Sequence, residues 1–211
     1  MPTISLQFIL EHLGVTVAAT TGVLAARGMR IDLFGVLVLA VVTSFGGGTT
    51  RDLLVGDLPV AWLREPSLLI NASITALIVF AVARKRNIAT HALVWADAGA
   101  LALFAVVGAR KGVTMHFSPI VCVLLGVTTG VVGGIIRDVL RREVPLVFQP
   151  EIRLYATAAL AGTAVQVTLP YLGISEASAS LIGGFVILGL RIAGIVWNLA
   201  LPRFETETPT P

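Results

Sequence analysis

The sequence predicts an all-α polytopic membrane protein with seven transmembrane helices, arranged as an inverted 3+3 repeat plus one additional helix. Three observations predict this fold. The chain is 56% hydrophobic and only 13% charged, whereas soluble domains carry about 25% charged residues. The apolar residues come in blocks of roughly 18 to 23, which is the length that crosses a bilayer as a helix. A glycine-rich motif that ends in Arg-Asp occurs twice, 86 residues apart.

Seven apolar segments form the predicted spans of a single transmembrane domain, residues 1–211. Their bounds are about 4–26, 33–54, 67–83, 92–108, 119–140, 152–172 and 177–199. Basic residues or Gly and Pro turn residues close most of these segments. The tail at 203–211 is rich in proline and threonine, so we expect it to be disordered.

The 86-residue offset extends beyond the motif, which indicates an internal duplication. Without gaps it pairs Glu11 with Asp97, Gly22 with Gly108, Thr43 with Thr129, Pro59 with Pro145, and Glu65 with Glu151. Repeat one then covers about 4–87 and repeat two about 90–173, with the seventh helix left over at about 177–199. Because each repeat has three spans, the second enters the membrane from the opposite side, as in inverted-repeat transporters.

The distribution of basic residues predicts an N-terminus outside and a C-terminus in the cytoplasm, because cytoplasmic loops of membrane proteins carry the excess of Lys and Arg. In this orientation nine loop cations lie inside and three outside. The inside group is Arg27, Arg30, Arg84, Lys85, Arg86, Arg141, Arg142, Arg153 and Arg203. The outside group is Arg64, Arg110 and Lys111.

The doubled motif interrupts two apolar segments with glycines. It spans Phe45–Asp52 in the first copy and Val131–Asp138 in the second. Its glycines are Gly46, Gly47 and Gly48, and then Gly133 and Gly134. Each glycine costs a helix about 1 kcal/mol relative to alanine, so we expect a bend or an unwound turn. Carbonyls freed there have to face protein or water and are natural cation ligands. The alternative is that small residues let helices pack closely.

The Arg-Asp pair that ends each copy is expensive to keep at membrane depth. Arg51 and Asp52 lie about 100° apart on a helix, so we expect them to point in different directions. One interpretation is structural: Arg51 would pair with Asp138 and Arg137 with Asp52, or the side chains would extend to the interface. The other is that the arginines line or gate an aqueous path. Hydroxyl groups would supply the polar wall, from Thr43, Ser44, Thr49, Thr50, Thr128 and Thr129.

Two local features of the sequence leave alternatives open. Thr49 and Asp52 have the spacing of a capping box, which predicts that a helix restarts after the glycines. Glu11 and Asp97 are the other intramembrane acids, and either a pore role or stabilisation of a helix N-terminus would explain them. No nucleophile–base arrangement, phosphate loop or metal-ligand spacing occurs. We therefore expect no enzyme, no metal site, no cofactor, no nucleic acid and no soluble partner, with the lipid bilayer as the surroundings.

The doubled motif resembles that of the trimeric intracellular cation (TRIC) channel family, most of all its prokaryotic members. Asp97 to Ala105 also matches that family's pattern, and the resemblance covers about Leu6 to Leu199. The resemblance implies a homotrimer in a prokaryotic inner membrane. It also implies one potassium-permeable pore per protomer, between kinked second and fifth helices. The short tail lacks the lysine-rich extension of animal members, so we expect no lipid-regulated gating of the animal kind.

The residues predicted to form the pore or gate follow from the motif and its resemblance. They are Gly46, Gly47, Gly48, Thr49, Thr50, Arg51, Asp52, Thr129, Gly133, Gly134, Arg137 and Asp138. Secondary candidates are Glu11, Asp97 and Ser44. Because some relatives carry a glycine-transporter label, the alternative function is a secondary carrier for a small zwitterion such as glycine. A purely structural membrane subunit is the third hypothesis.

Overall fold

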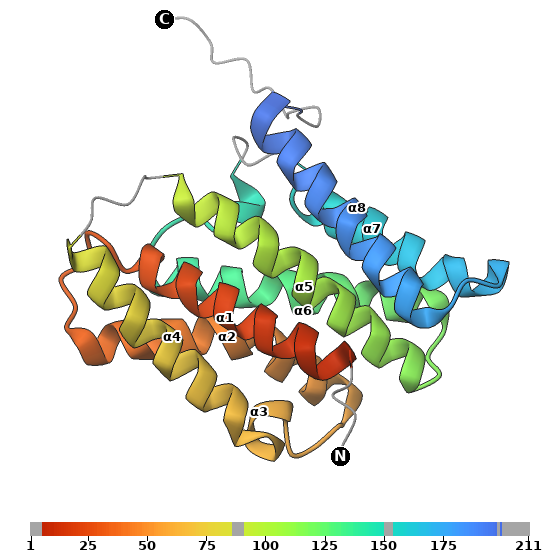
Figure 1. Cartoon of the computed structure of the whole chain (residues 1–211), viewed down its shortest axis with the longest axis horizontal. Coiled ribbons are helices and arrows are strands. Elements are labelled where there is room, and N and C mark those ends of the chain that lie inside the picture. The colour runs from red at the N-terminus through yellow and green to blue at the C-terminus, as the bar shows by residue number, and fades with distance from the viewer. Residues whose placement is uncertain (1–5, 86–90, 150–153, 198, 200–211) are drawn as a thin grey trace, which may run out of the picture.

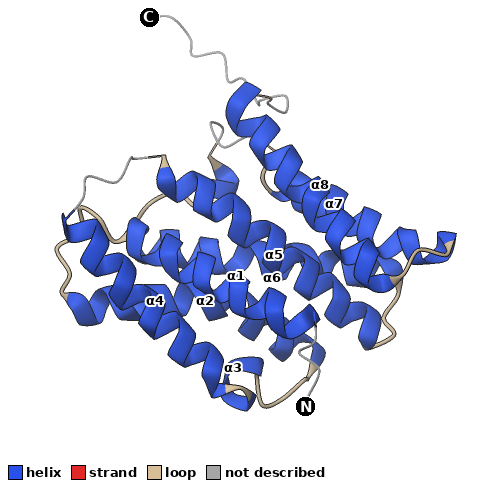
Figure 2. Cartoon of the chain, viewed as in Figure 1, coloured by secondary structure: helices blue, strands red, loops and turns tan. Residues whose placement is uncertain are grey.

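A computed structural model describes residues 6–85, 91–149, 154–197 and 199, and within them the chain is helical without β-strands (Figures 1 and 2). The α-helices are α1 (Leu6–Ala25), α2 (Leu33–Val55), α3 (Ala61–Arg64), α4 (Pro66–Lys85), α5 (Ala92–Thr114), α6 (Pro119–Leu140), α7 (Ala156–Thr168) and α8 (Glu176–Trp197). Two short 3₁₀ helices are η1 (Leu146–Phe148) and η2 (Leu169–Leu172). The predicted disorder at 203–211 lies outside the described residues.

Six helices in the described part of the chain are long and apolar enough to cross a membrane: α1, α2, α4, α5, α6 and α8. The predicted sixth span corresponds to α7, which has only 13 residues before η2 continues it. The 13 α-helical residues extend about 20 Å and the four 3₁₀ residues add about 8 Å, so the segment is slightly shorter than a hydrocarbon core of about 30 Å. The start of this predicted span, at 152, falls outside the described residues.

α5 is longer than the sequence predicted, because its charged end stays helical. The prediction ended this span at Gly108, before Arg110 and Lys111, but the helix continues to Thr114. Arg and Lys are good helix formers, and the Lys111 ammonium binds the Asp57 carboxylate in the loop after α2. The charge pair therefore marks a tertiary contact and does not end the helix.

The core is divided between two groups of helices. One hydrophobic cluster fills the space between α1, α2 and α4, around Leu39 and Ala72. A second lies among α5, α6, α7 and α8, around Leu101 and Ile187. Figure 1 shows α5 and α6 in the middle of the molecule, with α4 on one side and the antiparallel pair α7–α8 on the other. α1 packs on α5, and α2 packs on α6, so these helices join the two groups.

The glycines of the doubled motif bring α2 and α6 into backbone contact. A Cβ on Gly47 would clash with the Thr129 carbonyl oxygen, and one on Gly133 would clash with the Thr43 carbonyl oxygen. The two contacts are reciprocal, since Thr43 and Thr129, like Gly47 and Gly133, are 86 residues apart. They also show that α2 and α6 run antiparallel, because the later glycine on one helix meets the earlier residue on the other.

Neither helix unwinds at its glycines, so the predicted unwound turn was wrong, while a bend at the glycines stays a prediction. α2 is helical from Leu33 to Val55 and α6 from Pro119 to Leu140. The missing Cβ atoms are used for close approach, which is the packing alternative. The Thr50 hydroxyl donates to the Gly46 carbonyl at 2.8 Å, so this backbone group stays satisfied inside the helix.

Candidate functional site

The first Arg-Asp pair is buried near the C-terminal end of α2 and forms its own salt bridge. Arg51 Nε donates to Asp52 Oδ1 at 2.9 Å, and Arg51 Nη2 lies 2.7 Å from the same oxygen. The other carboxylate oxygen accepts from the Ala61 backbone N–H at 2.9 Å, at the first residue of α3. Asp52 therefore neutralises its neighbour and holds the start of α3.

The second pair repeats this arrangement at the end of α6. Arg137 donates to both oxygens of Asp138, from Nε at 2.8 Å and from Nη2 at 3.0 Å. Asp138 Oδ2 also accepts from the Leu146 backbone N–H at 3.0 Å, where η1 begins. In both copies the aspartate thus binds the preceding arginine and the short helix that follows.

The pairs form buried salt bridges, but the expected divergence of the two side chains and the expected cross-pairing were both wrong. The arginine side chain is long enough to bend back to the next residue despite the rotation of about 100° between them. The predicted cross-pairing of Arg51 with Asp138 fails for a different reason. Because α2 and α6 are antiparallel through the glycine contacts, Asp138 lies level with about residue 38 of α2. That level is on the order of 20 Å from Arg51 along the helix axis.

A small cavity of about 40 Å³ lies beside the first pair. It has space for a few water molecules or an unhydrated monovalent cation. Its lining combines the Arg51–Asp52 pair with Glu11, Ser44 and Thr129, so α1, α2 and α6 each contribute a polar group. The remaining lining residues are Val15, Phe45, Gly48, Thr49, Ala61, Trp62, Leu68, Phe104 and Val107. The first pair thus borders a space with polar groups on its wall.

The hydroxyl groups of this cavity are oriented by the backbone. Ser44 Oγ donates to the Ala40 carbonyl at 2.8 Å, and Thr129 Oγ1 donates to the Leu125 carbonyl at 2.6 Å. Since each hydroxyl hydrogen is used in this way, the oxygen lone pairs remain for the cavity. The Thr49 hydroxyl differs from these two, because its oxygen accepts from Trp62 Nε1 at 3.1 Å. The predicted capping box is wrong, because α2 continues through Thr49.

Glu11 and Asp97, which the repeat pairs, have different partners. Glu11 accepts from Gln7 Nε2 at 2.9 Å on its own helix and lines the cavity. Asp97 is buried and accepts from Arg137 Nη1 at 2.9 Å, across from α5 to α6. Arg137 therefore has two carboxylate partners and is 0% exposed. Asp97 neutralises Arg137 on the neighbouring helix α6. Stabilisation of the N-terminus of its own helix therefore does not explain why this acid is buried.

The glycines three residues before the arginines, Gly48 and Gly134, also differ in their surroundings. A Cβ on Gly48 would meet only Arg51 Nη2, at 3.9 Å. A Cβ on Gly134 would lie 3.2 Å from the Tyr155 hydroxyl oxygen, 3.6 Å from Asp97 Oδ1 and 3.7 Å from Arg137 Nη2. The space at the first glycine is open, and the corresponding space at the second is filled by side chains.

Tyr155 and Arg191 were not among the residues predicted from the sequence. Tyr155 is the N-cap residue of α7 and is buried. Arg191, six residues before the C-terminal end of α8, is 0% exposed, and its guanidinium carbon lies 4.7 Å from the Tyr155 ring centroid. A charged residue inside an apolar span is itself a functional signal, but α8 lies outside the repeat and offered no matching position to compare.

The sequence analysis also missed the role of Asp57, which joins the two groups of helices outside the spans. Asp57 Oδ2 binds Arg64 at 2.5 Å and also binds Lys111 from the end of α5. The hydrogen bond from Arg64 and then that from Lys111 lower the pKa of Asp57 from 3.8 to about 2. Asp57 therefore stays ionised across the physiological pH range.

Comparison with known proteins gives the family. The sequence matches the family model described as "Glycine transporter" over residues 8–84 and 94–171. It is 42% identical to the UPF0126 inner membrane protein YadS of Escherichia coli K12, over 96% of this chain and 98% of that protein. It is 41% identical to a UPF0126 membrane protein of Vibrio cholerae, over 95% of this chain and 83% of that protein.

Solved structures of TRIC channels share the fold of this chain. The TRIC trimeric intracellular cation channel orthologue from Rhodobacter sphaeroides is 36% identical, with a TM-score of 0.86 over 92% of this chain and 98% of that chain. The chain belongs to the prokaryotic TRIC channel family. A prokaryotic TRIC channel solved in 0.5 M KCl is 32% identical, with a TM-score of 0.82 over 92% of this chain and 98% of that chain. The resemblance seen in the sequence is confirmed.

The two TRIC motifs of this chain do not meet at one point. Antiparallel packing brings Gly46, Gly47, Gly133 and Thr129 together at the centre of the α2–α6 pair. The two Arg-Asp pairs lie toward opposite ends of that pair. Ser44, Thr49 and Glu11 gather with the first pair, and Asp97 and Gly134 gather with the second. The predicted site residues therefore form two separate polar clusters joined by a tightly packed middle.

Proposed function

We propose that the protein is a potassium-permeable cation channel with one pore in each protomer, along the α2–α6 pair. The observation that carries this proposal is the cavity beside the first Arg-Asp pair, whose largely apolar wall holds a few polar groups. The cavity brings carboxylate and hydroxyl oxygens to a path between helices. Three solved structures of TRIC cation channels share the fold, at TM-scores between 0.82 and 0.86, and no enzymatic role is part of the proposal.

The charges around the cavity favour a cation. Arg51 and Asp52 neutralise each other through their salt bridge, so Glu11 leaves the cavity with a net negative charge. A cleft lined by one sign of charge raises the local concentration of the opposite ion. The lone pairs of Ser44 and Thr129 can replace water around a cation that has lost part of its hydration shell. The arginine therefore does not repel potassium from this cavity.

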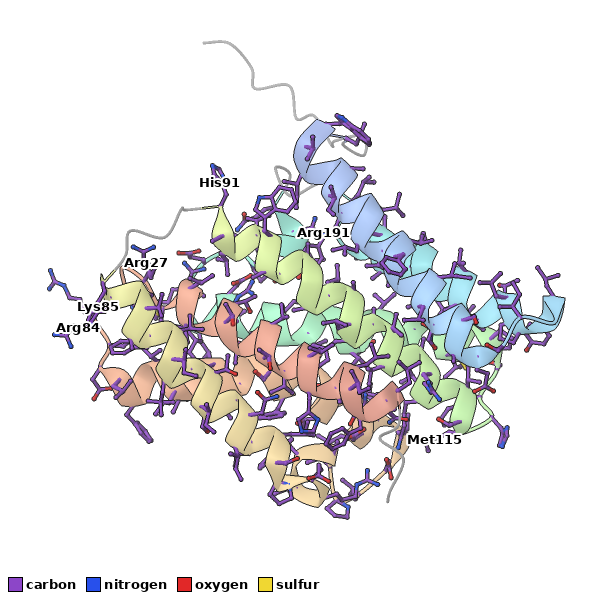
Figure 3. The ribbon with its side chains drawn as sticks, in the orientation of Figure 1. Arg27, Arg84, Lys85, His91, Met115 and Arg191 are labelled. Carbon is purple, nitrogen blue, oxygen red and sulfur yellow. The ribbon has the colours of Figure 1, made fainter. Side chains whose placement is uncertain are left out.

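We further propose the inverted 3+3 arrangement, a homotrimer in the inner membrane, and the orientation with the N-terminus outside. The reciprocal contacts of Gly47 and Gly133 support the inverted repeat. The Rhodobacter sphaeroides orthologue is named as trimeric, and YadS is named as an inner membrane protein. Figure 3 places Arg27, Arg84 and Lys85 at the end of the bundle away from Met115, which supports one basic side. The first cavity would then lie toward the outside.

A second candidate function is a secondary carrier for a zwitterion such as glycine. The family model that matches the chain is described as a glycine transporter. One observation favours this candidate: Arg51 and Glu11 share a cavity. Their charges are those that would bind the carboxylate and the amine of an amino acid. A broken-helix site, which such carriers use, is absent from α2 and α6, where the helices continue through the glycines.

Planar-bilayer recording of the purified protein tests the two functions. A channel gives unitary potassium currents, and Glu11→Gln lowers their conductance because it removes the net charge of the cavity. Arg51→Ala also changes conductance or gating. Asp32→Asn is the matched control, because this exposed acid caps α2 away from the cavity and asparagine caps equally well. Saturable glycine counterflow without current supports the carrier, and unchanged conductance in Glu11→Gln and Arg51→Ala counts against this cavity as the pore.

A further inference from the structure

α8 carries a buried charge that the two repeats do not explain. Arg191 is 0% exposed within a 22-residue apolar helix. Figure 3 shows it between α5 and α8. Ionisable residues inside membrane helices are costly, and they persist where they have a partner and a function. One partner is the Tyr155 ring, 4.7 Å from the guanidinium carbon, which is within cation–π distance.

Tyr155 connects this arginine to the second Arg-Asp pair. Its hydroxyl oxygen would lie 3.2 Å from a Cβ on Gly134, which is two turns from the end of α6. Asp97 and Arg137 approach the same position. Arg191, Tyr155 and Gly134 thus form a continuous series of contacts from α8, through the start of α7, to α6.

The corresponding position in the first repeat has no such cover. A Cβ on Gly48 would be close only to the neighbouring arginine, and Gly48 borders the cavity. The position 86 residues before Tyr155 is Leu69, which is half-buried on α4 and carries no polar group. At the Gly134 end of the α2–α6 pair, Tyr155 and Arg191 therefore fill a space. The equivalent space at the Gly48 end is open.

We propose that Arg191 is a positioning residue that holds the second-motif end of the pore closed by keeping Tyr155 over Gly134. The inference rests on the proposed channel function and adds a regulatory role for α8, the helix outside the repeat. Movement of α8 that lifts the guanidinium from the ring frees Tyr155 to leave Gly134. The cavity that opens there mirrors the one beside Gly48. Arg191 acts on the open probability, while the permeation path determines the unitary conductance.

Single-channel recording of the full chain in planar bilayers tests this role. Arg191→Gln is expected to raise the open probability at least tenfold while unitary potassium conductance stays within twofold of wild type. Arg191→Lys keeps a cation over the ring and is expected to restore a low open probability. Ile192→Ala is the matched control, because this neighbouring side chain is half-exposed on α8 and is expected to leave gating unchanged.

A second variant separates gating from a general loss of structure. Tyr155→Phe keeps the ring beneath Arg191 but removes the hydroxyl over Gly134, and it is expected to raise the open probability several-fold. Because both changes act on one series of contacts, Arg191→Gln combined with Tyr155→Phe should open little more than Arg191→Gln alone. Strict multiplication of the two effects, or wild-type open probability in assembled Tyr155→Phe, overturns the inference. Absence of potassium current from the wild type overturns the proposed channel itself.

Discussion

The two copies of the glycine–Arg–Asp motif share their local chemistry and differ in what surrounds them. In each, the arginine binds the next aspartate, and that aspartate accepts a backbone N–H from the short helix that follows. The first copy borders a cavity of about 40 Å³. The second is enclosed by Asp97, Tyr155 and Arg191. The motif therefore has the same local structure in both copies, and the neighbouring residues determine whether a cavity lies beside it.

The acid on the preceding helix contributes most to this difference. Asp97 forms a salt bridge with Arg137. The second cluster therefore has no free negative charge at this position of α5. Glu11 accepts a hydrogen bond from the neutral Gln7 side chain and lines the cavity, and no ion pair involves it among the described residues. Glu11 and Asp97 occupy equivalent positions, 86 residues apart. In the second repeat this acid, Asp97, is the counter-ion of an arginine. In the other repeat the acid, Glu11, lines the cavity.

The largest expected effect separates these two acids. Asp97→Ala removes one of the two carboxylate partners of a fully buried arginine. Asp138 still pairs with Arg137, so the cost stays below that of a fully broken buried ion pair, about 3–5 kcal/mol. Thermal unfolding in detergent, followed by size-exclusion chromatography, should show a large loss of stability. Glu11→Ala in the same assay should lose much less, because no ion pair is broken. Equal losses for the two variants would show that the acids are equivalent after all.

The next effect tests the contact that the two copies share. Gly47→Ala and Gly133→Ala each place a Cβ against a backbone carbonyl of the partner helix. A backbone oxygen cannot rotate away, so α2 and α6 must separate, at about 1–3 kcal/mol for overpacking. Both variants should lower the unfolding temperature by similar amounts. Gly184→Ala, where the added atom would meet only Val106 at 3.4 Å, is the control. A loss in only one of the two would contradict the reciprocal contact.

Much of the fold could be predicted from apolar block lengths, and the pairing of charges could not. All the long spans except α5 begin and end within about two residues of their predicted bounds, because hydrocarbon thickness fixes their length. The charged end of α5 was misplaced because Lys111 binds Asp57 far away in the sequence. Periodicity also cannot show that glycines would be used for packing between α2 and α6. That depends on which helices become neighbours.

For the candidate site, too, the residues could be predicted from the sequence but their partners could not. The repeat identified the two Arg-Asp pairs, Glu11 and Asp97 as polar groups inside the membrane, because such groups are conspicuous in apolar segments. Their partners depend on the antiparallel contact of α2 and α6, which separates the two pairs along the helix axis. Arg191 was a visible signal of the same kind. It had no counterpart in the repeat, so a comparison between halves passed over it.

A smaller effect compares the glycines beside the arginines. Gly48→Ala adds a methyl group in open space and should stabilise α2 by about 0.5–1 kcal/mol through helix propensity. At Gly134 the same change brings Cβ to 3.2 Å from the Tyr155 hydroxyl oxygen, so the tyrosine has to shift. The gain should therefore be cancelled in Gly134→Ala. Unfolding temperatures measured side by side give the comparison, and an equal gain at both positions would mean that the second cluster is as open as the first.

The smallest effect compares Asp57 with Glu143, the residue 86 positions later. Asp57 binds Arg64 and Lys111, whereas Glu143 is exposed and binds only Arg141 among the ion pairs of the described residues. Because Asp57 is partly accessible to solvent, its bridges are worth no more than about 1 kcal/mol. Asp57→Asn should lower the unfolding temperature slightly, and Glu143→Gln should lower it less.

The pH dependence of the unfolding temperature of Asp57→Asn tests how the Asp57 salt bridges contribute to stability. The pKa of Asp57 is lowered from 3.8 to about 2 by Arg64 and Lys111. A lowered pKa in the folded state means that the stabilisation is fully present above the unfolded value and is lost as the pH falls toward 2. The difference in unfolding temperature between wild type and Asp57→Asn should therefore stay constant from pH 8 to about pH 5 and shrink below pH 4. A difference that already shrinks between pH 8 and pH 6 would show that another group controls the link between the two halves.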